Sequence, residues 1–277
     1  GHQGGAVADE LLSRGDHEVR VLTRRPDSER SAELQDQGAE VFSGDLTDLD
    51  SLRSAADGVD AIFGVTTGFE SGMDVEVAQG YNLVDAASQT GARLVFSSVA
   101  WAYANTRIPH FESKWQIEQR LRSSKVPHTI LGPSFFMANI VAPWSLPMLK
   151  NDNIYAVPLS PAVPVPMVAL QNIAEMAILA LENPDRLNGQ RLDLAGDIQT
   201  GASIAEILSE ITGRPIRYYE VPKTQVESED LRLMFEWYES QRPTLDINAL
   251  QKNFPEVHWY TCREWAESQN WMELLGG

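Results

Sequence analysis

The chain has a single cysteine, Cys262, and only five lysines among its 22 basic residues. A single cysteine excludes an intrachain disulfide and a cysteine-rich metal site, so no metal site is expected. No apolar run approaches the ~20 residues that a membrane-spanning helix needs, and no signal peptide is visible. We therefore expect a cytoplasmic protein whose 277 residues form one large domain, or a large domain with a smaller one.

Positive charge is also scarce. The chain has 39 acidic and 22 basic residues, which gives a net charge of −17. This charge repels nucleic acid and anionic membranes, so neither is an expected partner. An anionic ligand must instead be held by a local group of basic side chains or by backbone N–H groups.

The first 135 residues alternate between short apolar runs and amphipathic segments. Apolar strands separated by helix-length segments predict a parallel sheet covered on both faces. Glycines occur where left-handed helix ends are expected, at positions 15, 38, 58 and 91. The sequence thus predicts a doubly wound α/β (Rossmann) domain over residues 1–150. The expected strands are 17–23, 39–45, 60–67, 93–100 and 128–135, and the expected helices are 4–14, 28–37, 48–56, 73–90 and 111–123.

Closely spaced prolines interrupt this alternation after Phe136. Residues 151–277 are predicted to form a smaller mixed α/β domain, with a boundary that is not a single point in the chain. We expect a helix at 172–181, a strand at 190–194 and a strand at 216–221. Two further helices are expected to begin with capping boxes, Ser203 with Glu206 and Thr261 with Glu264.

The chain opens with the glycine-rich segment Gly1-His2-Gln3-Gly4-Gly5, which leads into a helical pattern. Glycines at this place allow the backbone to approach a pyrophosphate, and the helix N-terminus favours its negative charge. A strand normally precedes such a loop. We therefore expect a first strand and a further glycine upstream of Gly1, and a chain that starts at Gly1 is expected to be poorly stable. A flexible chain start is the alternative for this segment.

The strand at 17–23 ends in Thr23-Arg24-Arg25, where an NAD-preferring site carries an acidic residue. Guanidinium groups can bind a 2′-phosphate with two hydrogen bonds. The pair therefore favours NADP(H), with a solvated surface pair as the alternative. Asp45 and Leu46, after the next strand, are expected beside the adenine, although Asp45 could instead cap the following helix.

Seven segments, in this order, resemble the NmrA-like family of atypical short-chain dehydrogenases. They are GHQGGAV, VLTRRP, GDLTD, GYNLVDAA, VFSSVA, HFESKWQIE and TILGPSFFMANI. The resemblance implies a Rossmann domain that binds NADP(H) and a smaller C-terminal domain that forms one wall of a cleft. The expected cofactor contacts are Gly1, His2, Gln3, Gly4, Arg24, Arg25, Asp45, Leu46, Thr66, Ser97, Lys114, Pro133 and Phe136.

Relatives of this kind use a Tyr-x-x-x-Lys pair, whose spacing puts both side chains on one helix face. Here Lys114 occupies the lysine position, and His110 occupies the tyrosine position. Ser98 is the nearest candidate for the serine that polarises a substrate carbonyl, and Tyr103 could replace the missing phenol. A solvated lysine, a helix-start histidine and a strand-end serine are the structural alternatives. Phe135, Phe136, Met137 and Trp144 could line an apolar substrate pocket or pack between domains.

Two classes of function follow. The first is an NADPH-dependent reductase of a small quinone, enone or carbonyl compound. The second is a non-catalytic NADP(H)-sensing regulator that binds a protein partner. A nucleotide-sugar epimerase ranks below both because such enzymes usually retain the tyrosine. A monomer and a homodimer are both compatible with the sequence.

Overall fold

The computed structural model describes residues 1–276 and divides into two compact units. The first unit contains residues 1–132 and 173–193, and the second contains 133–172 and 194–277. The chain therefore leaves the first unit at residue 132 and returns to it for 21 residues, whereas the sequence analysis set the boundary near residue 150. In the described part of the chain, no helix combines the length and the apolar character needed to cross a membrane.

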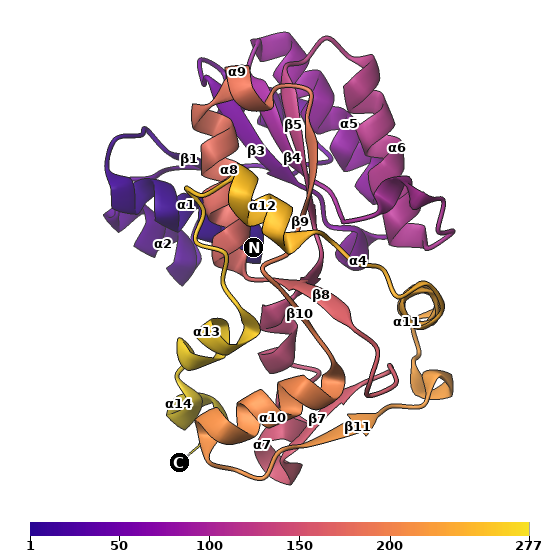
Figure 1. Ribbon diagram of the computed structural model, residues 1–277. Helices are drawn as coiled ribbons and strands as arrows, with labels where there is room; N and C mark the ends of the chain where they lie inside the picture. Colours follow the sequence, from indigo (N-terminus) through magenta and orange to yellow (C-terminus); the bar gives the residue numbers. More distant parts are fainter. Residues whose placement is uncertain (277) are drawn as a thin grey trace. The chain divides into compact units, whose positions relative to one another are not determined.

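The first unit holds parallel strands that alternate with helices, as predicted (Figure 1). Strand β1 (Arg20–Thr23) pairs in parallel with β2 (Glu40–Ser43). A second sheet has the order β3 (Ala61–Val65), β4 (Arg93–Ser97), β5 (His128–Pro133) and β9 (Arg191–Leu194), and its first three strands are parallel. The predicted α/β class with parallel strands is thus confirmed, and the described strands of this unit fall into two sheets because β1 and β3 are not paired with each other.

The helices of the first unit follow the predicted segments closely. Gly15 and Gly91 end the first and fifth helices with φ of 74° and 79°, the left-handed conformation expected of them. The first helix begins at His2, two residues before its predicted start, so Gly1 is its N-cap and the expected loop is its first turn. The helices are α1 (His2–Arg14), α2 (Glu29–Asp36), α3 (Leu49–Ala56), α4 (Gly68–Ser71), α5 (Met73–Thr90), α6 (Pro109–Ser123), most of α8 (Leu170–Glu182) and α9 (Pro184–Leu187), with a 3₁₀ turn at Ala102–Ala104.

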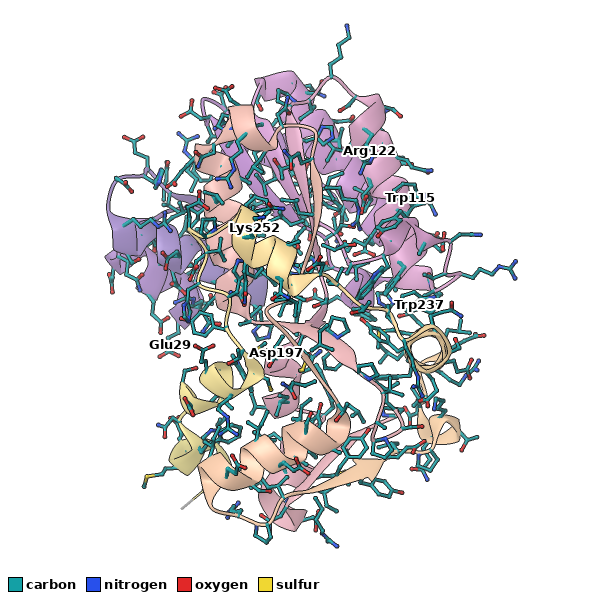
Figure 2. All side chains as sticks on the ribbon, in the orientation of Figure 1. Glu29, Trp115, Arg122, Asp197, Trp237 and Lys252 are labelled. Carbon is teal, nitrogen blue, oxygen red and sulfur yellow. The ribbon has the colours of Figure 1, made fainter. Side chains whose placement is uncertain are left out.

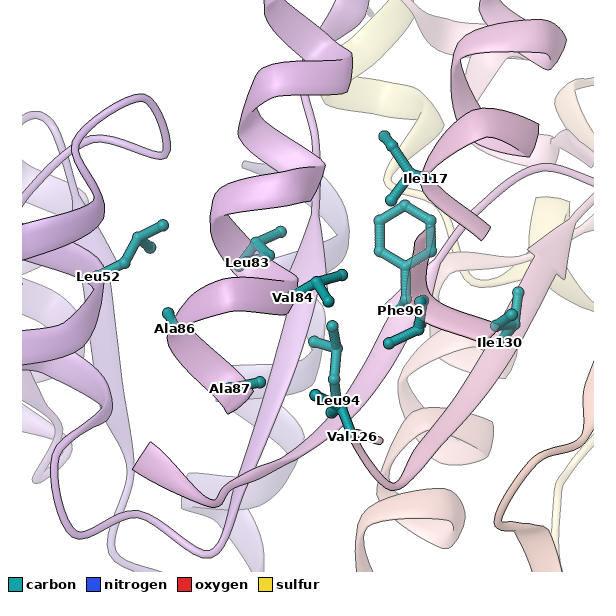
Figure 3. Close-up of a cluster of buried hydrophobic side chains, with 11 residues drawn as sticks. Leu52, Leu83, Val84, Ala86, Ala87, Leu94, Phe96, Ile117, Val126 and Ile130 are labelled. Atoms are coloured by element: carbon teal, nitrogen blue, oxygen red, sulfur yellow. The ribbon is translucent and has the colours of Figure 1, made fainter. Parts of the chain in front are cut away.

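A buried hydrophobic cluster joins α3, α5 and α6 to β4 and β5 (Figure 3). Phe96 of β4 and Ile117 of α6 lie at its centre and are fully buried. A Cβ atom on Gly80 of α5 would lie 2.6 Å from Cγ2 of Ile117, so glycine allows α5 and α6 to approach closely. Burial of each large apolar side chain contributes roughly 1.5–3 kcal/mol. This packing holds α6 against α5 and the strands β4 and β5.

The second unit contains two small sheets. One has the order β10 (Asp197–Gln199), β8 (Val165–Val168) and β6 (Phe135–Phe136), and the other pairs β7 (Ile154–Val157) with β11 (Arg217–Glu220) in parallel. Its helices are α7 (Leu146–Asp152), α10 (Gly201–Thr212), α11 (Glu229–Gln241), α12 (Ile247–Asn253), α13 (Cys262–Glu267) and α14 (Trp271–Leu275), with 3₁₀ turns at Met137–Val141 and Lys223–Gln225. Asp197, labelled in Figure 2, accepts a hydrogen bond of 2.8 Å from the backbone N–H of Cys262 and so joins β10 to α13.

One of the two predicted capping boxes is confirmed. Thr261 and Glu264 cap each other reciprocally at the start of α13. The other prediction is wrong, because α10 begins earlier and its reciprocal partners are Thr200 and Ser203. Ser203 is therefore the third residue of the helix rather than its cap. Its hydroxyl accepts a hydrogen bond from the backbone N–H of Thr200, which is the role expected of Glu206.

Candidate functional site

The first turn of α1 is hydrogen-bonded to the end of β4. The hydroxyl of Ser97 donates to Oε1 of Gln3 at 2.6 Å. This contact joins residues 94 positions apart, both of them expected cofactor contacts. The first turn of a helix carries backbone N–H groups without intrahelical acceptors, so Gly1, His2, Gln3 and Gly4 form an anion-favouring end next to β4.

Lys114 of α6 lies buried at the carboxyl ends of β3 and β4. Its Nζ donates to Oγ1 of Thr66 at 2.6 Å and forms an ion pair with Glu76 at 3.0 Å. Longer contacts join Nζ to the carbonyl oxygens of Thr66 and Ser97, at 3.4 and 3.5 Å. The ammonium therefore holds together the ends of the neighbouring strands β3 and β4.

Glu76 of α5 is the acidic centre of this buried group. Its carboxylate accepts hydrogen bonds from the hydroxyls of Thr66 and Ser113 and from the backbone N–H of Gly68. Burial raises the pKa of Glu76, but Lys114 and these hydroxyls outweigh burial and hold the pKa below its ordinary value. Burial lowers the pKa of the Lys114 ammonium, and Glu76 opposes that shift. The Glu76 carboxylate is therefore ionised at neutral pH.

His110 and Lys114 lie one turn apart on α6. The His110 side chain is buried between two phenyl rings, with its ring centroid 5.0 Å from that of Phe69 and 4.7 Å from that of Phe111. Phe69 belongs to the short helix α4, and two-thirds of its own surface is exposed. An imidazole thus occupies the place of the missing tyrosine, beneath an exposed aromatic ring.

The two arginines after β1 have different surroundings. Nη2 of Arg24 donates to the Glu70 carboxylate of α4 at 2.5 Å, and its Nε lies 4.0 Å from Oδ2 of Asp45. Among the residues that the structure describes, no ion pair joins the Arg25 guanidinium to a carboxylate. Asp45 does not cap α3, because Asp48 does so.

The hydrogen bonds that Asp45 accepts come from Thr47, whose backbone N–H and hydroxyl donate at 2.8 and 2.7 Å. These bonds are the main cause that lowers the pKa of Asp45. The carbonyl oxygen of the neighbouring Leu46 accepts from the side-chain amide of Asn82 at 2.9 Å, which joins this loop to α5. Asp45 and Leu46 are therefore held in place on the loop that follows β2.

The Ser98 hydroxyl is bonded to a buried carboxylate that the sequence analysis did not single out. It donates to Oε1 of Glu118 at 2.5 Å. Glu118 also pairs with Nε of Arg191 at 2.9 Å and lies 3.8 Å from Arg122, which is labelled in Figure 2. His110, Lys114 and Glu118 follow one another at intervals of four, so their side chains lie on one face of α6. This spacing of three ionisable residues is the sequence signal that could have identified Glu118.

Tyr103 lies in the 3₁₀ turn after β4 and is half-exposed. Its hydroxyl donates to Oδ2 of Asp193 at 3.3 Å, and the Arg191 guanidinium lies 4.6 Å from the centroid of its ring. Arg191 is also paired with Asp193. Burial and the Asp193 carboxylate raise the pKa of Tyr103, so the phenol stays protonated at neutral pH.

The remaining expected residues belong to the second unit. Pro133 is buried at the end of β5, and Phe136 is half-buried in β6. Phe135 lines a small, largely apolar cavity of this unit together with Tyr155, Met167 and Tyr218. Met137 is fully buried, whereas Trp144 is 72% exposed and so does not pack in the core.

The chain matches the model of the NmrA-like family over residues 1–273. It is 30% identical over 274 residues to the NmrA-like family domain-containing oxidoreductase lnaB of Aspergillus flavus, with 85% of this chain and 80% of that protein covered. The solved structures that share its fold include two with a bound dinucleotide. NmrA, described as a negative transcriptional regulator in complex with NADP, superposes with a TM-score of 0.81 at 20% identity, with 99% of this chain and 93% of that chain covered. The NADPH-dependent quinone oxidoreductase QOR2 of Escherichia coli, complexed with NADPH, gives 0.78 at 19% identity, with 95% of each chain covered.

Proposed function

The chain belongs to the NmrA-like family, and we propose that it binds NADP(H) and reduces a small quinone, enone or carbonyl compound. One observation carries the binding proposal. Contacts join Arg24 to Glu70 of α4, Gly68 of α4 to Glu76, and Glu76 to Lys114. The same ammonium contacts Ser97, which bonds Gln3 of α1. These contacts link Arg24, Lys114 and Ser97 at the carboxyl ends of the strands to Gln3 at the start of α1, and doubly wound folds bind dinucleotides at this edge, which supports the proposal.

The residues of this edge suit the parts of NADP(H). The first turn of α1 would face the pyrophosphate, and Arg24 and Arg25 would bind the 2′-phosphate. Asp45 and Leu46 would lie beside the adenine. Thr66, Ser97 and Lys114 would face the nicotinamide ribose, whose hydroxyls can replace the two long carbonyl contacts of Nζ. Pro133 and Phe136 remain predictions from the second unit.

When bound, the cofactor supplies the hydride, so the protein must orient the substrate and provide a proton. We assign the proton to His110, because it occupies the tyrosine position one turn from Lys114, beneath the exposed ring of Phe69, whereas burial and the Asp193 carboxylate raise the pKa of the alternative donor Tyr103. The Ser98 hydroxyl already donates to Glu118, so its proton is not directed at a substrate carbonyl. A quinone needs little acid assistance, which is compatible with the loss of the tyrosine.

The test is NADPH consumption against a panel of quinones, enones and aldehydes. His110→Ala should lower kcat by ~10²-fold while leaving the Kd for NADP(H) unchanged. His128→Ala is the control, since His128 lies at the opposite, amino end of β5. Full turnover by His110→Ala would contradict the assignment and direct attention to Tyr103→Phe.

A non-catalytic sensor is the second candidate. It is favoured by the same three features, namely the imidazole at the tyrosine position, the engaged Ser98 hydroxyl and the raised pKa of Tyr103. NmrA, a fold relative described as a transcriptional regulator, was solved with NADP. A wild-type protein that binds NADP(H) but reduces no compound of the panel would support this alternative, with a protein partner in place of a substrate.

A further inference from the structure

Arg24 is held by an acidic partner at the place where the proposed function needs a free guanidinium. Its Nη2 lies 2.5 Å from Oε2 of Glu70, and both side chains are about half exposed. A 2′-phosphate would need the same N–H groups. The phosphate and the Glu70 carboxylate therefore compete for one guanidinium.

Glu70 is presented by an anchored segment rather than by a free loop. The backbone N–H of Gly68, two residues earlier, donates to the buried Glu76 at 3.2 Å. A Cβ atom on Gly68 would lie 2.6 Å from Oε2 of Glu76, so the segment sits directly on that carboxylate. Phe69 packs its ring on His110. These two contacts flank Glu70 on its N-terminal side and hold its carboxylate near Arg24.

We propose that Glu70 is a specificity-determining residue that weakens the preference for NADP(H) over NAD(H) by competing with the 2′-phosphate for Arg24. The inference rests on the proposed NADP(H) binding. NAD(H) has no 2′-phosphate, so it leaves the pair of Arg24 and Glu70 intact. Only NADP(H) must displace the carboxylate and accept its repulsion, while Arg25 lies beside it without such a partner among the described residues.

The size of the effect follows from the exposure of the pair. An exposed ion pair is weak, so the phosphate can displace it. The displaced Glu70 carboxylate would lie beside the 2′-phosphate dianion and repel it. The strength of this repulsion depends on the distance between the two groups. Removing the charge of Glu70 should therefore tighten NADP⁺ binding by about three- to tenfold, and NAD⁺ binding should change by less than about twofold. Asp45, 4.0 Å from Nε of Arg24, remains in place and limits the gain.

The experiment is calorimetric titration of NADP⁺ and NAD⁺ into the wild type, Glu70→Gln and Glu210→Gln. Glu210 is a matched control, because it forms an equally short, exposed pair with Arg263 at 2.5 Å in the second unit. Glu70→Gln should tighten NADP⁺ binding alone, and Glu210→Gln should alter neither affinity. In an Arg24→Gln background, the gain from Glu70→Gln should be clearly smaller, because only the direct repulsion between the carboxylate and the 2′-phosphate is then removed.

Unchanged NADP⁺ affinity in Glu70→Gln would overturn the inference, as would an equal gain for NADP⁺ and NAD⁺. A gain of the same size in the Arg24→Gln background would also overturn it, because the competition acts through that guanidinium. A wild type that binds neither dinucleotide overturns the proposed function itself, and that result is read from the wild-type titrations before any variant is compared.

Discussion

At the scale of single residues, the ion pair between Lys114 and Glu76 combines two roles. It lies buried between α5 and α6 and binds the ends of β3 and β4 through Thr66 and Ser97. Removal of one partner from such a pair leaves an uncompensated buried charge. The lysine expected to serve a cofactor is therefore also a structural residue, and its variants need a stability measurement beside any binding measurement.

Lys114→Met should lower the free energy of unfolding by about 3–5 kcal/mol, because Glu76 would remain buried without its counterion. Arg120→Met is the matched control, since Arg120 of α6 pairs with Asp85 of α5 at 2.7 Å on the surface. That control should cost at most about 1 kcal/mol. Urea unfolding at pH 7 gives both values. Equal losses in the two variants would contradict the structural role of Lys114.

The same pair predicts a pH dependence. The pKa of Glu76 is lower in the folded protein than its ordinary value of 4.5. Its contribution to stability is therefore complete above pH 4.5 and is lost as the pH falls through the folded-state pKa. Urea unfolding of the wild type and Glu76→Gln should show a smaller acid-induced loss in the variant. Identical slopes below pH 4.5 would show that Glu76 is not the titrating group.

At the scale of elements, α6 organises the site. It presents His110, Lys114 and Glu118 at successive turns, and each is buried against a different partner. His110 contacts Phe69, Lys114 contacts Glu76, and Glu118 contacts Ser98. The position of α6 against α5 depends on Gly80, whose missing side chain makes room for Ile117.

Gly80→Ala should therefore destabilise the protein by about 1–3 kcal/mol, because the new methyl group overlaps Ile117. Alanine has a higher helix propensity than glycine, by ~1 kcal/mol, so helix propensity alone would predict a rise in the free energy of unfolding rather than a loss. Gly4→Ala is the control, since nothing lies within 4 Å of a Cβ atom at that position of α1. The control should raise the free energy of unfolding slightly, and thermal unfolding distinguishes the two signs.

The sequence predicted those elements whose signals are local. The helix at 73–90 has its predicted bounds, and Gly15 and Gly91 end their helices as expected. Predictions at chain starts and caps were less accurate, because several residues can cap the same turn. Ser203 was chosen as a cap where Thr200 takes that place, and the glycines after Gly1 continue the helix rather than forming a loop.

The partners of the site residues could not be read from the sequence. Glu70 meets Arg24 across 46 positions, and Arg191 meets Glu118 across 73. Such pairs depend on which loops the fold brings to one edge, and a single sequence taken alone contains no record of that. The α/β class and the residue types at the strand ends could be predicted, whereas the contacts that limit Arg24 and Ser98 required the structure.

At the scale of the whole molecule, binding of an anionic dinucleotide takes place against a net charge of −17. Long-range repulsion opposes the approach of the ligand and is screened over about 8 Å at physiological salt. The preference for NADP(H) must therefore come from local contacts. Arg24 and Arg25 are the basic residues proposed to bind the 2′-phosphate, and the proposed function depends on them more than on any other pair.

The most direct test of this claim is calorimetric titration of NADP⁺ and NAD⁺ into the wild type and into the Arg24→Ala, Arg25→Ala double variant. Each charge-assisted contact contributes roughly 1.5–3 kcal/mol, so the wild type should prefer NADP⁺ and the double variant should lose most of that preference. An Arg53→Ala, Arg120→Ala variant changes the net charge equally at other exposed positions and should keep it. An NADP⁺ affinity that is the same in the wild type and the double variant would contradict the account.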